Sequence, residues 1–273
     1  MMIVRKAIVF GFLAWAAAFA TTPSSSALAQ AGLNETPEEI DQRLGPWLDL
    51  RGGGISIGRP QGVVTTNPDG TTTGAYGALA NAEALPRRGE GFRSVSSEDE
   101  SAGAGHLVSL LVNSAAYIHE LYPDVELHIG DLSRTDGGYF YPPHKSHQNG
   151  LDVDLLFVGE TRWRSVLDGE VVSPRFNFEK NWEYWRAIVG QRVRVKGRDE
   201  SVVSMILVDP IIKTAVCEWA AREGLDKTLE GEEILRRLRP TAGHDDHFHI
   251  RIRCSPYHSQ CEGDFSPPKV TGC

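Results

Sequence analysis

Two short clusters of histidine and aspartate constrain the fold of this chain more than any other sequence feature. One runs through His144, His147, Asp152 and Asp154, and the other is His244-Asp245-Asp246-His247-Phe248-His249. Each cluster lies beside an apolar, β-branched run that is typical of a buried strand. Side chains two apart on a strand share a face, so Asp152 projects with Asp154 and His247 with His249. If the two strands are neighbours in a sheet, imidazoles and carboxylates converge on one point.

Imidazole nitrogen and carboxylate oxygen are donors that zinc binds at about 2.0 to 2.2 Å, usually with three protein ligands in a catalytic site. The alternative is a polar loop and a surface strand with incidental histidines, which is the better interpretation of a histidine that stands alone. Two clusters, each beside an apolar strand, favour a metal centre. The histidines outside the clusters are expected to be structural or surface residues: His106, His119, His128 and His258.

The pattern of apolar residues predicts a chain that mixes helices and strands. Apolar side chains recur at three- and four-residue steps from Gly105 to Leu121, which predicts an amphipathic helix. Further helices are expected over 181–189, 210–222 and 232–238, and strands over 125–129, 151–157, 204–208 and 248–253. Because these elements do not alternate regularly, we expect an α+β fold with a central antiparallel sheet flanked by helices and long loops.

The N-terminus has the features of a signal peptide. Arg5 and Lys6 precede an apolar run over 7–20, and Ala27-Leu28-Ala29 supplies small residues for cleavage after Ala29. That run is shorter than the ~20 residues of a spanning helix, so no stable membrane insertion is expected after cleavage. Residues 30–95 are expected to form an irregular N-terminal wrapping segment. They make one domain with the core of residues 96–273.

The charge of the chain argues against nucleic acid as a partner. The formal net charge is −8, and loss of Arg5 and Lys6 with the signal peptide makes it −10 (26 basic against 36 acidic side chains). Nucleic-acid phosphates require a basic surface. The sequence also contains no glycine-rich phosphate loop and no Gly-x-Ser-x-Gly nucleophile elbow.

Four cysteines lie in the last quarter of the chain, at Cys217, Cys254, Cys261 and Cys273. An even number of spaced cysteines in an exported protein predicts two disulfides, for which three pairings are possible. The short segment between Cys254 and Cys261 is easily closed. That pairing leaves Cys217 with Cys273, which would hold the C-terminal tail against the body of the protein.

The two histidine clusters resemble a known family. The segment Ser146-His147-Gln148-Asn149-Gly150-Leu151-Asp152-Val153-Asp154, together with His247-Phe248-His249-Ile250-Arg251, closely resembles the penicillin-insensitive murein endopeptidases. These belong to a wider group with lysostaphin-like enzymes, D-Ala-D-Ala carboxypeptidases and the hedgehog fold. Shorter segments follow in the family's order, over roughly residues 45 to 273: Ser56-Ile57-Gly58, Gly77-Ala78-Leu79, Leu85-Pro86, Ile129-Gly130-Asp131, Val208-Asp209-Pro210 and Arg253-Cys254. Residues 159–203 align poorly.

The resemblance implies a set of site residues in a metallopeptidase core over 96–273. It makes His147, Asp154 and His249 the ligands of one Zn²⁺ ion, and His247 and His244 the catalytic histidines. It places His144 at the rim, where a second ion could be held, and its half-cystine pattern agrees with the two disulfides given above. It further implies a periplasmic enzyme that cuts D-alanyl–diaminopimelate cross-links between peptidoglycan stem peptides.

The sequence contains no His-Glu-x-x-His helix to supply a glutamate base. A histidine must therefore move the proton, and Asp152, Asp245 and Asp246 could orient the histidine rings.

Other functions remain as alternatives. A related D,D-carboxypeptidase would share every ligand. A cell-wall binding domain could keep the metal without turnover. A non-haem iron oxygenase also uses two histidines and a carboxylate, but its usual His-x-Asp spacing is absent.

Overall fold

The computed structural model describes residues 53–61, 65–66, 68–70, 72–73, 77–140, 144–195, 198–263 and 266–273. The expected signal peptide and residues 30–52 lie outside this range. The division into residues 1–29, 30–95 and 96–273 therefore stays a prediction.

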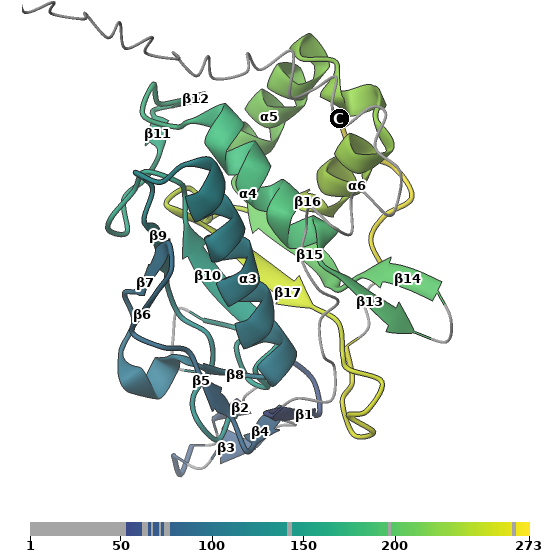
Figure 1. Ribbon diagram of the computed structural model, residues 1–273. Coiled ribbons are helices and arrows are strands. Elements are labelled where there is room, and N and C mark those ends of the chain that lie inside the picture. Colours follow the sequence, from purple (N-terminus) through teal and green to yellow (C-terminus); the bar gives the residue numbers. More distant parts are fainter. Residues whose placement is uncertain are drawn as a thin grey trace, which may run out of the picture.

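The described chain folds around a mixed seven-stranded sheet (Figure 1). In spatial order its strands are β16 (Leu238–Pro240), β15 (Val203–Val208), β17 (His247–Ile252), β10 (Asp152–Leu156), β9 (Leu127–Ile129), β7 (Phe92–Ser94) and β6 (Arg88–Gly89). The central strands β15, β17, β10 and β9 are antiparallel, as predicted. The outer pairs β15–β16 and β7–β9 are parallel. The edge strand β6 pairs with β7 in the antiparallel direction. The α+β class is confirmed, with a mixed sheet whose four central strands are antiparallel.

Further strands form two-stranded pairs outside this sheet. They are β1 (Ile55–Ile57) with β4 (Ala78–Ala80), β2 (Thr65–Thr66) with β3 (Thr72–Thr73), β5 (Glu83–Ala84) with β8 (Ala102–Gly103), β11 (Leu167–Asp168) with β12 (Val171–Val172), and β13 (Arg192–Val195) with β14 (Arg198–Ser201). Strands of two to four residues are too short to show a period in the sequence, and none of these pairs was predicted.

Four helices are described: α3 (Gly105–Leu121), α4 (Phe178–Gly190), α5 (Pro210–Arg222) and α6 (Leu229–Arg237), with short 3-10 helices at Glu98–Glu100 and Leu225–Lys227. Helices α3 and α5 begin and end at the predicted residues. Helix α4 begins three residues before the prediction because Asn177 caps it, its side chain accepting from Lys180 N at 2.9 Å. Helix α6 likewise begins three residues before its predicted start at residue 232, because the Thr228 side chain caps it by accepting from Gly231 N. Within the described residues, none of the helices is long and apolar enough to cross a membrane.

Strand β17 separates the hydrophobic core from the polar face of the sheet. Phe248, Ile250 and Ile252 are buried on one side, where the Phe248 ring lies 5.5 Å from Tyr184 and 5.9 Å from Trp185 of helix α4. Helices α3 and α4 lie side by side over this face (Figure 1). Because side chains alternate along a strand, His247, His249 and Arg251 project to the opposite face. The same six residues thus contribute to the core and to the histidine cluster.

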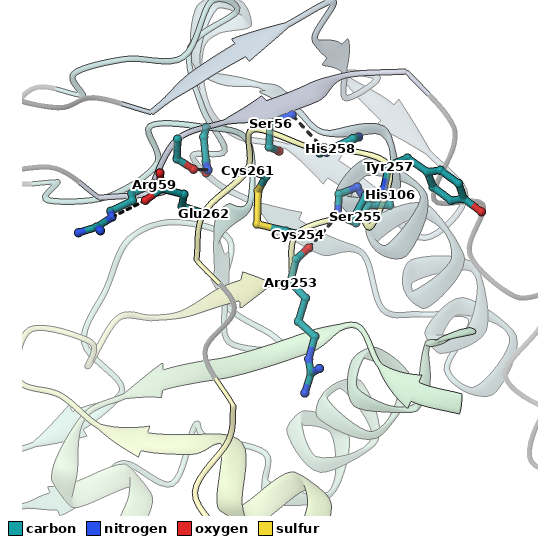
Figure 2. The surroundings of a disulfide bond; sticks show 12 residues. Ser56, Arg59, His106, Arg253, Cys254, Ser255, Tyr257, His258, Cys261 and Glu262 are labelled. Carbon is teal, nitrogen blue, oxygen red and sulfur yellow. Dashed lines mark hydrogen bonds and ion pairs between the residues drawn. A yellow bond between two sulfur atoms is a disulfide. The ribbon is translucent and has the colours of Figure 1, made fainter. Parts of the chain in front are cut away.

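Two disulfides join Cys217 to Cys273 and Cys254 to Cys261, the pairing expected from the sequence. The first holds the C-terminus against α5. The second closes a loop that binds the N-terminal segment, because Gly58 N donates to Gln260 O at 2.8 Å and Glu262 N donates to Gly58 O at 2.9 Å. Figure 2 shows this loop, with the Arg59–Glu262 ion pair beside it.

His258 of the second disulfide loop and His106 of helix α3 are both buried, as expected of structural histidines (Figure 2). His106 Nε2 lies 3.0 Å from Arg253 O, and Ser56 N donates to His258 Nδ1 at 3.3 Å. The two rings are 5.5 Å apart. Burial lowers the pKa of His106 to about 4, and the hydrogen bond to Arg253 O offsets this only in part. His106 is therefore neutral in the folded protein near pH 7.

We predict that His106 makes the protein less stable in acid. Its folded pKa is about 4, whereas a histidine in the unfolded chain titrates near 6.5, so its contribution to stability is complete above about pH 6.5 and is lost as the pH falls toward 4. At 1.36 kcal/mol per unit, the loss reaches ~3 kcal/mol. Urea unfolding of wild type and His106→Asn at pH 7 and pH 4.5 measures it. The variant should lose less stability on acidification, whereas His119→Asn should behave as wild type. An equal loss in His106→Asn would contradict the prediction.

Candidate metal centre

Strands β10 and β17 bring the two histidine clusters together. They are antiparallel neighbours, with Asp154 opposite His249 and Asp152 opposite Arg251. His144 and His147 come from the loop that leads into β10. His147 has a positive φ of 63°, a conformation that is uncommon for residues other than glycine. The convergence predicted from the alternation of strand side chains is therefore observed.

The buried carboxylate of Asp154 lies at the centre of four imidazoles. Its Oδ1 is 2.8 Å from His249 Nδ1, 3.4 Å from His147 Nε2 and 3.7 Å from His247 Nε2. Its Oδ2 is 3.6 Å from His144 Nδ1. Ligand atoms of His144, His147 and Asp154 all lie within 4.8 Å of one another, a group that could hold a metal ion.

The outer partners of His147 and His249 determine which ring nitrogen faces Asp154. His147 Nδ1 lies 2.6 Å from the carbonyl oxygen of Leu132, and His249 Nε2 lies 2.8 Å from Asp152 Oδ1. These oxygens can only accept, so each ring donates its N–H outward and a neutral ring directs its other lone pair toward Asp154.

Acceptors that face one another across a buried site need a cation between them. Donors at about 2.1 Å from a tetrahedral ion stand about 3.4 Å apart, which matches the 3.4 Å between His147 Nε2 and Asp154 Oδ1, whereas His249 Nδ1 and Asp154 Oδ1 lie at the hydrogen-bond distance of 2.8 Å. The chemistry of these donors suits a divalent ion, and the ligand atoms of His144, His147 and Asp154 have a spacing that could hold one.

Asp152 links both histidines to a buried arginine. Its carboxylate accepts from Arg251 Nε at 2.6 Å and from Arg251 Nη2 at 3.3 Å, while Oδ2 also accepts from His147 N at 3.2 Å. Arg251 Nη1 reaches Gln61 Oε1 at 3.3 Å. Burial alone would raise the pKa of Asp152, but Arg251 and His249 outweigh it and lower that pKa. Asp152 is therefore an ionised, hydrogen-bonded support for the cluster.

The same electrostatic balance acts on Asp154 and His249. Burial opposes ionisation of Asp154, yet His147 and His249 hold the pKa of this carboxyl well below its usual range. Burial lowers the pKa of His249, but hydrogen bonds to Asp152 and Asp154 outweigh that effect and raise it. A metal ion that binds His249 Nδ1 must therefore displace the proton that this nitrogen would otherwise hold.

His247 and His244 lie side by side at the edge of the cluster. Their ring centroids are 5.0 Å apart, and His247 Nδ1 lies 2.6 Å from Asp246 Oδ1. Burial lowers the pKa of His247, but Asp246 and Asp154 outweigh it and raise that pKa. The pKa of His244 is lowered by burial and then by the nearby histidines His247 and His249. Because the pKa of His247 is raised and that of His244 is lowered, His247 can hold a proton at a pH at which His244 is free to accept one.

His144 packs against His147, and its main partner is Asp131. His144 Nε2 is 3.1 Å from Asp131 Oδ2, and its ring is 4.8 Å from both Phe140 and His147. Asp131 Oδ1 also accepts from the Ser96 hydroxyl. His144 is half-buried there, and its role at the rim of the site stays a prediction.

Sequence reasoning missed several residues of the site. Arg251 projects from the same strand face as His247 and His249, so strand alternation could have identified it. The Leu132 carbonyl and the Trp163 ring, which lies 5.3 Å from His247, gave no local signal. Of the aspartates considered as orienting groups, Asp152 and Asp246 bond to imidazoles, whereas Asp245 contributes its backbone carbonyl to Val166 N at 2.7 Å.

An α+β domain that gathers histidines and carboxylates on the polar face of its sheet has the site of a metal-dependent hydrolase. Comparison with known proteins agrees. The family model described as penicillin-insensitive murein endopeptidase matches residues 71–273. A curated penicillin-insensitive murein endopeptidase of Klebsiella pneumoniae is 32% identical over 228 residues, covering 76% of each chain. One of Escherichia coli is 31% identical over 212 residues (72% of this chain, 70% of the relative), and one of Haemophilus influenzae is 29% identical over 213 residues (73% and 69%).

The chain belongs to the penicillin-insensitive murein endopeptidase family, and it is a peptidase. The resemblance found from the sequence is confirmed. The His144, His147 and Asp154 group is compatible with a metal-dependent member of that family.

We predict that Asp152 controls metal affinity. Asp152→Ala removes the acceptor of His249 and the bond to His147 N, so affinity for Zn²⁺ should fall about 10- to 100-fold. Competition with a chromophoric chelator measures this, and Asp152→Asn, which keeps one acceptor, should lose less. Asp245→Asn is the matched control, since among the described residues Asp245 is engaged only through its backbone carbonyl, which accepts from Val166 N. An unchanged affinity in Asp152→Ala would contradict the prediction.

Proposed function

We propose that this protein is a zinc-dependent murein endopeptidase that hydrolyses D-alanyl–diaminopimelate cross-links in peptidoglycan. The observation that carries the metal site is the arrangement of His147 and His249, whose outer nitrogens are occupied and whose inner nitrogens face Asp154. The family gives the substrate, because the curated relatives are named penicillin-insensitive murein endopeptidases. The bond that is cut is inferred from the resemblance described above.

The proposed ligands of the ion are His147, Asp154 and His249. Two imidazoles and one carboxylate suit zinc, which as a catalytic ion takes three protein ligands and leaves one position open. When bound there, zinc polarises the peptide carbonyl and lowers the pKa of a coordinated water. His144, paired with Asp131 at 3.1 Å, is the proposed place for a second ion.

His247 and His244 are the proposed catalytic histidines. Asp246 holds His247 at Nδ1, and His247 Nε2 faces the site, 3.7 Å from Asp154 Oδ1. His247 is thereby oriented to take a proton from the attacking water or to stabilise the oxyanion. His244 assists from beside it, its Nδ1 lying 3.3 Å from the carbonyls of Thr241 and Ala242. This chemistry uses no nucleophilic serine, so penicillin has no serine to acylate.

We also propose that the protein is exported to the periplasm after cleavage behind Ala29. The two disulfides support this location, because disulfides persist in oxidising compartments. A peptidoglycan peptidase must reach the cell wall. The N-terminal sequence supplies the expected signal.

Digestion of purified peptidoglycan with and without a chelator tests the function. We expect cross-linked dimers to disappear and intact monomers to appear, and we expect the chelator to stop the reaction because the ion is required. Chromatography with mass spectrometry of the fragments measures both. Release of free D-alanine instead would identify a D,D-carboxypeptidase. Unchanged fragments with tight binding would identify a binding domain.

We predict that His249 and His247 differ in their effects. His249→Ala removes a ligand, so both metal and activity should be lost. His247→Ala leaves the ligands intact, so it should keep the metal and lose turnover about 10²- to 10⁴-fold, as expected for a proton-transfer group. Metal analysis and dimer cleavage by the same preparations measure this. If His247→Ala keeps full activity, the role assigned to His247 is wrong.

A further inference from the structure

A partly exposed tryptophan stands at the edge of the metal centre. Trp163, in the loop between β10 and β11, is 42% exposed, and its ring meets His247 edge-on with centroids 5.3 Å apart. Its benzo ring lies over Gly130, where any added side chain would collide with it. Gly130 N donates to Asp154 O at 2.7 Å. The indole is therefore seated against the strand residues that carry the site.

The loop that carries Trp163 is fixed at both ends. Arg175 donates from Nη1 to Glu160 Oε1 at 2.7 Å and from Nη2 to Ser165 O at 2.9 Å. Val166 N donates to Asp245 O at 2.7 Å, which ties the loop to the segment that carries His244 and His247. Such a preorganised ring loses little conformational entropy when it contacts a ligand.

A scattered exposed tryptophan would need no explanation. Trp163 is exposed to solvent and lies within contact distance of His247, a proposed catalytic histidine. An apolar face at that position would contact the part of a bound peptide that lies close to His247. Location and anchoring together indicate a wall of the binding site.

The residues that flank Trp163 indicate the charge of the ligand. Arg162 and Arg164 are exposed, and neither forms an ion pair with another described residue. They flank Trp163 in the sequence, on the same loop, in a chain whose formal net charge is −8. Guanidinium groups bind carboxylates through charge-assisted hydrogen bonds. The loop thus combines an apolar ring with two cations, which suits a peptide that carries free carboxylates.

We propose that residues 162–164 form the substrate-binding wall of this peptidase. Trp163 packs against the peptide residue next to the scissile bond, and Arg162 and Arg164 attract carboxylates of an anionic peptide. This inference rests on the proposed function, since it assumes that peptide is bound over the metal centre. It gives a role to loop residues that the family resemblance leaves unassigned and to Gly130, which makes room for the indole.

Steady-state cleavage of a purified cross-linked muropeptide dimer tests the wall. Trp163→Ala should raise KM about 10- to 100-fold, the effect of losing the burial of a large ring, with kcat little changed. Trp163→Phe should restore most of the loss. The matched control is Tyr257→Ala, which removes an exposed aromatic ring (57%) from the distant disulfide loop and should behave as wild type. Zinc content should be equal in all four proteins.

Two results would contradict the proposal that residues 162–164 form the substrate-binding wall. One is an unchanged KM in Trp163→Ala. The other is a fall in kcat alone with a displaced pH profile, which would mean that Trp163 only orients His247. Failure of the proposed function would look different, because the wild-type protein itself would then leave the dimer uncut.

Binding can be measured without turnover. In the His247→Ala background, the dimer should change the intrinsic fluorescence, and adding Trp163→Phe should remove that change although the tryptophans at positions 47, 182, 185 and 219 remain. For the cations, Arg162→Gln/Arg164→Gln should raise KM several-fold at low salt and less at high salt, because screening weakens the attraction. A salt-independent KM equal to that of wild type would show that the wall does not select anionic peptides.

Discussion

The pairing of Asp154 with His249 across β10 and β17 is the constraint on which the rest of the site depends. A shift of one residue in this register would turn His247, His249 and Arg251 toward the helices and Phe248 toward the site. The buried aromatic contacts of Phe248 with α4 oppose such a shift. The apolar core thus fixes the geometry of the polar centre, since one strand serves both faces of the sheet.

Burying so many ionisable groups is costly unless each charge has a partner. Here the partners form one network. Arg251 neutralises Asp152, Asp152 fixes the ring of His249 and the backbone of His147, and both imidazoles face Asp154. Gln61 bonds to Arg251, and Asn149 Nδ2 donates to Gly58 O at 3.1 Å. Gly58 also pairs with the segment around the second disulfide, so it links that segment to the loop before β10.

The surroundings of the centre are divided by chemistry. Ligand candidates lie on the sheet and on the loop before β10. Proton-transfer candidates lie at the start of β17 and in the segment just before it, and the exposed Trp163 ring stands on a separate anchored loop. This division agrees with a peptidase, whose substrate must approach the metal and the histidines from solvent while the carboxylates stay buried. Asp152 and Asp154 are fully buried, whereas His247 and His244 remain partly exposed.

The sequence by itself determined the helices α3 and α5, the four central strands, the α+β class, the family and the residues that cluster. These follow from local periodicity, motif spacing and resemblance to a known family, which need no knowledge of the fold. Only the tertiary structure decided that Leu132 O and Asp152 direct the two imidazoles, that Asp131 pairs with His144, that Arg251 supports Asp152, and that Trp163 lies over Gly130. Those contacts join residues from separate elements, and the short outer strands show no period. No local pattern encodes them, because they exist only once the sheet has set which segments are neighbours.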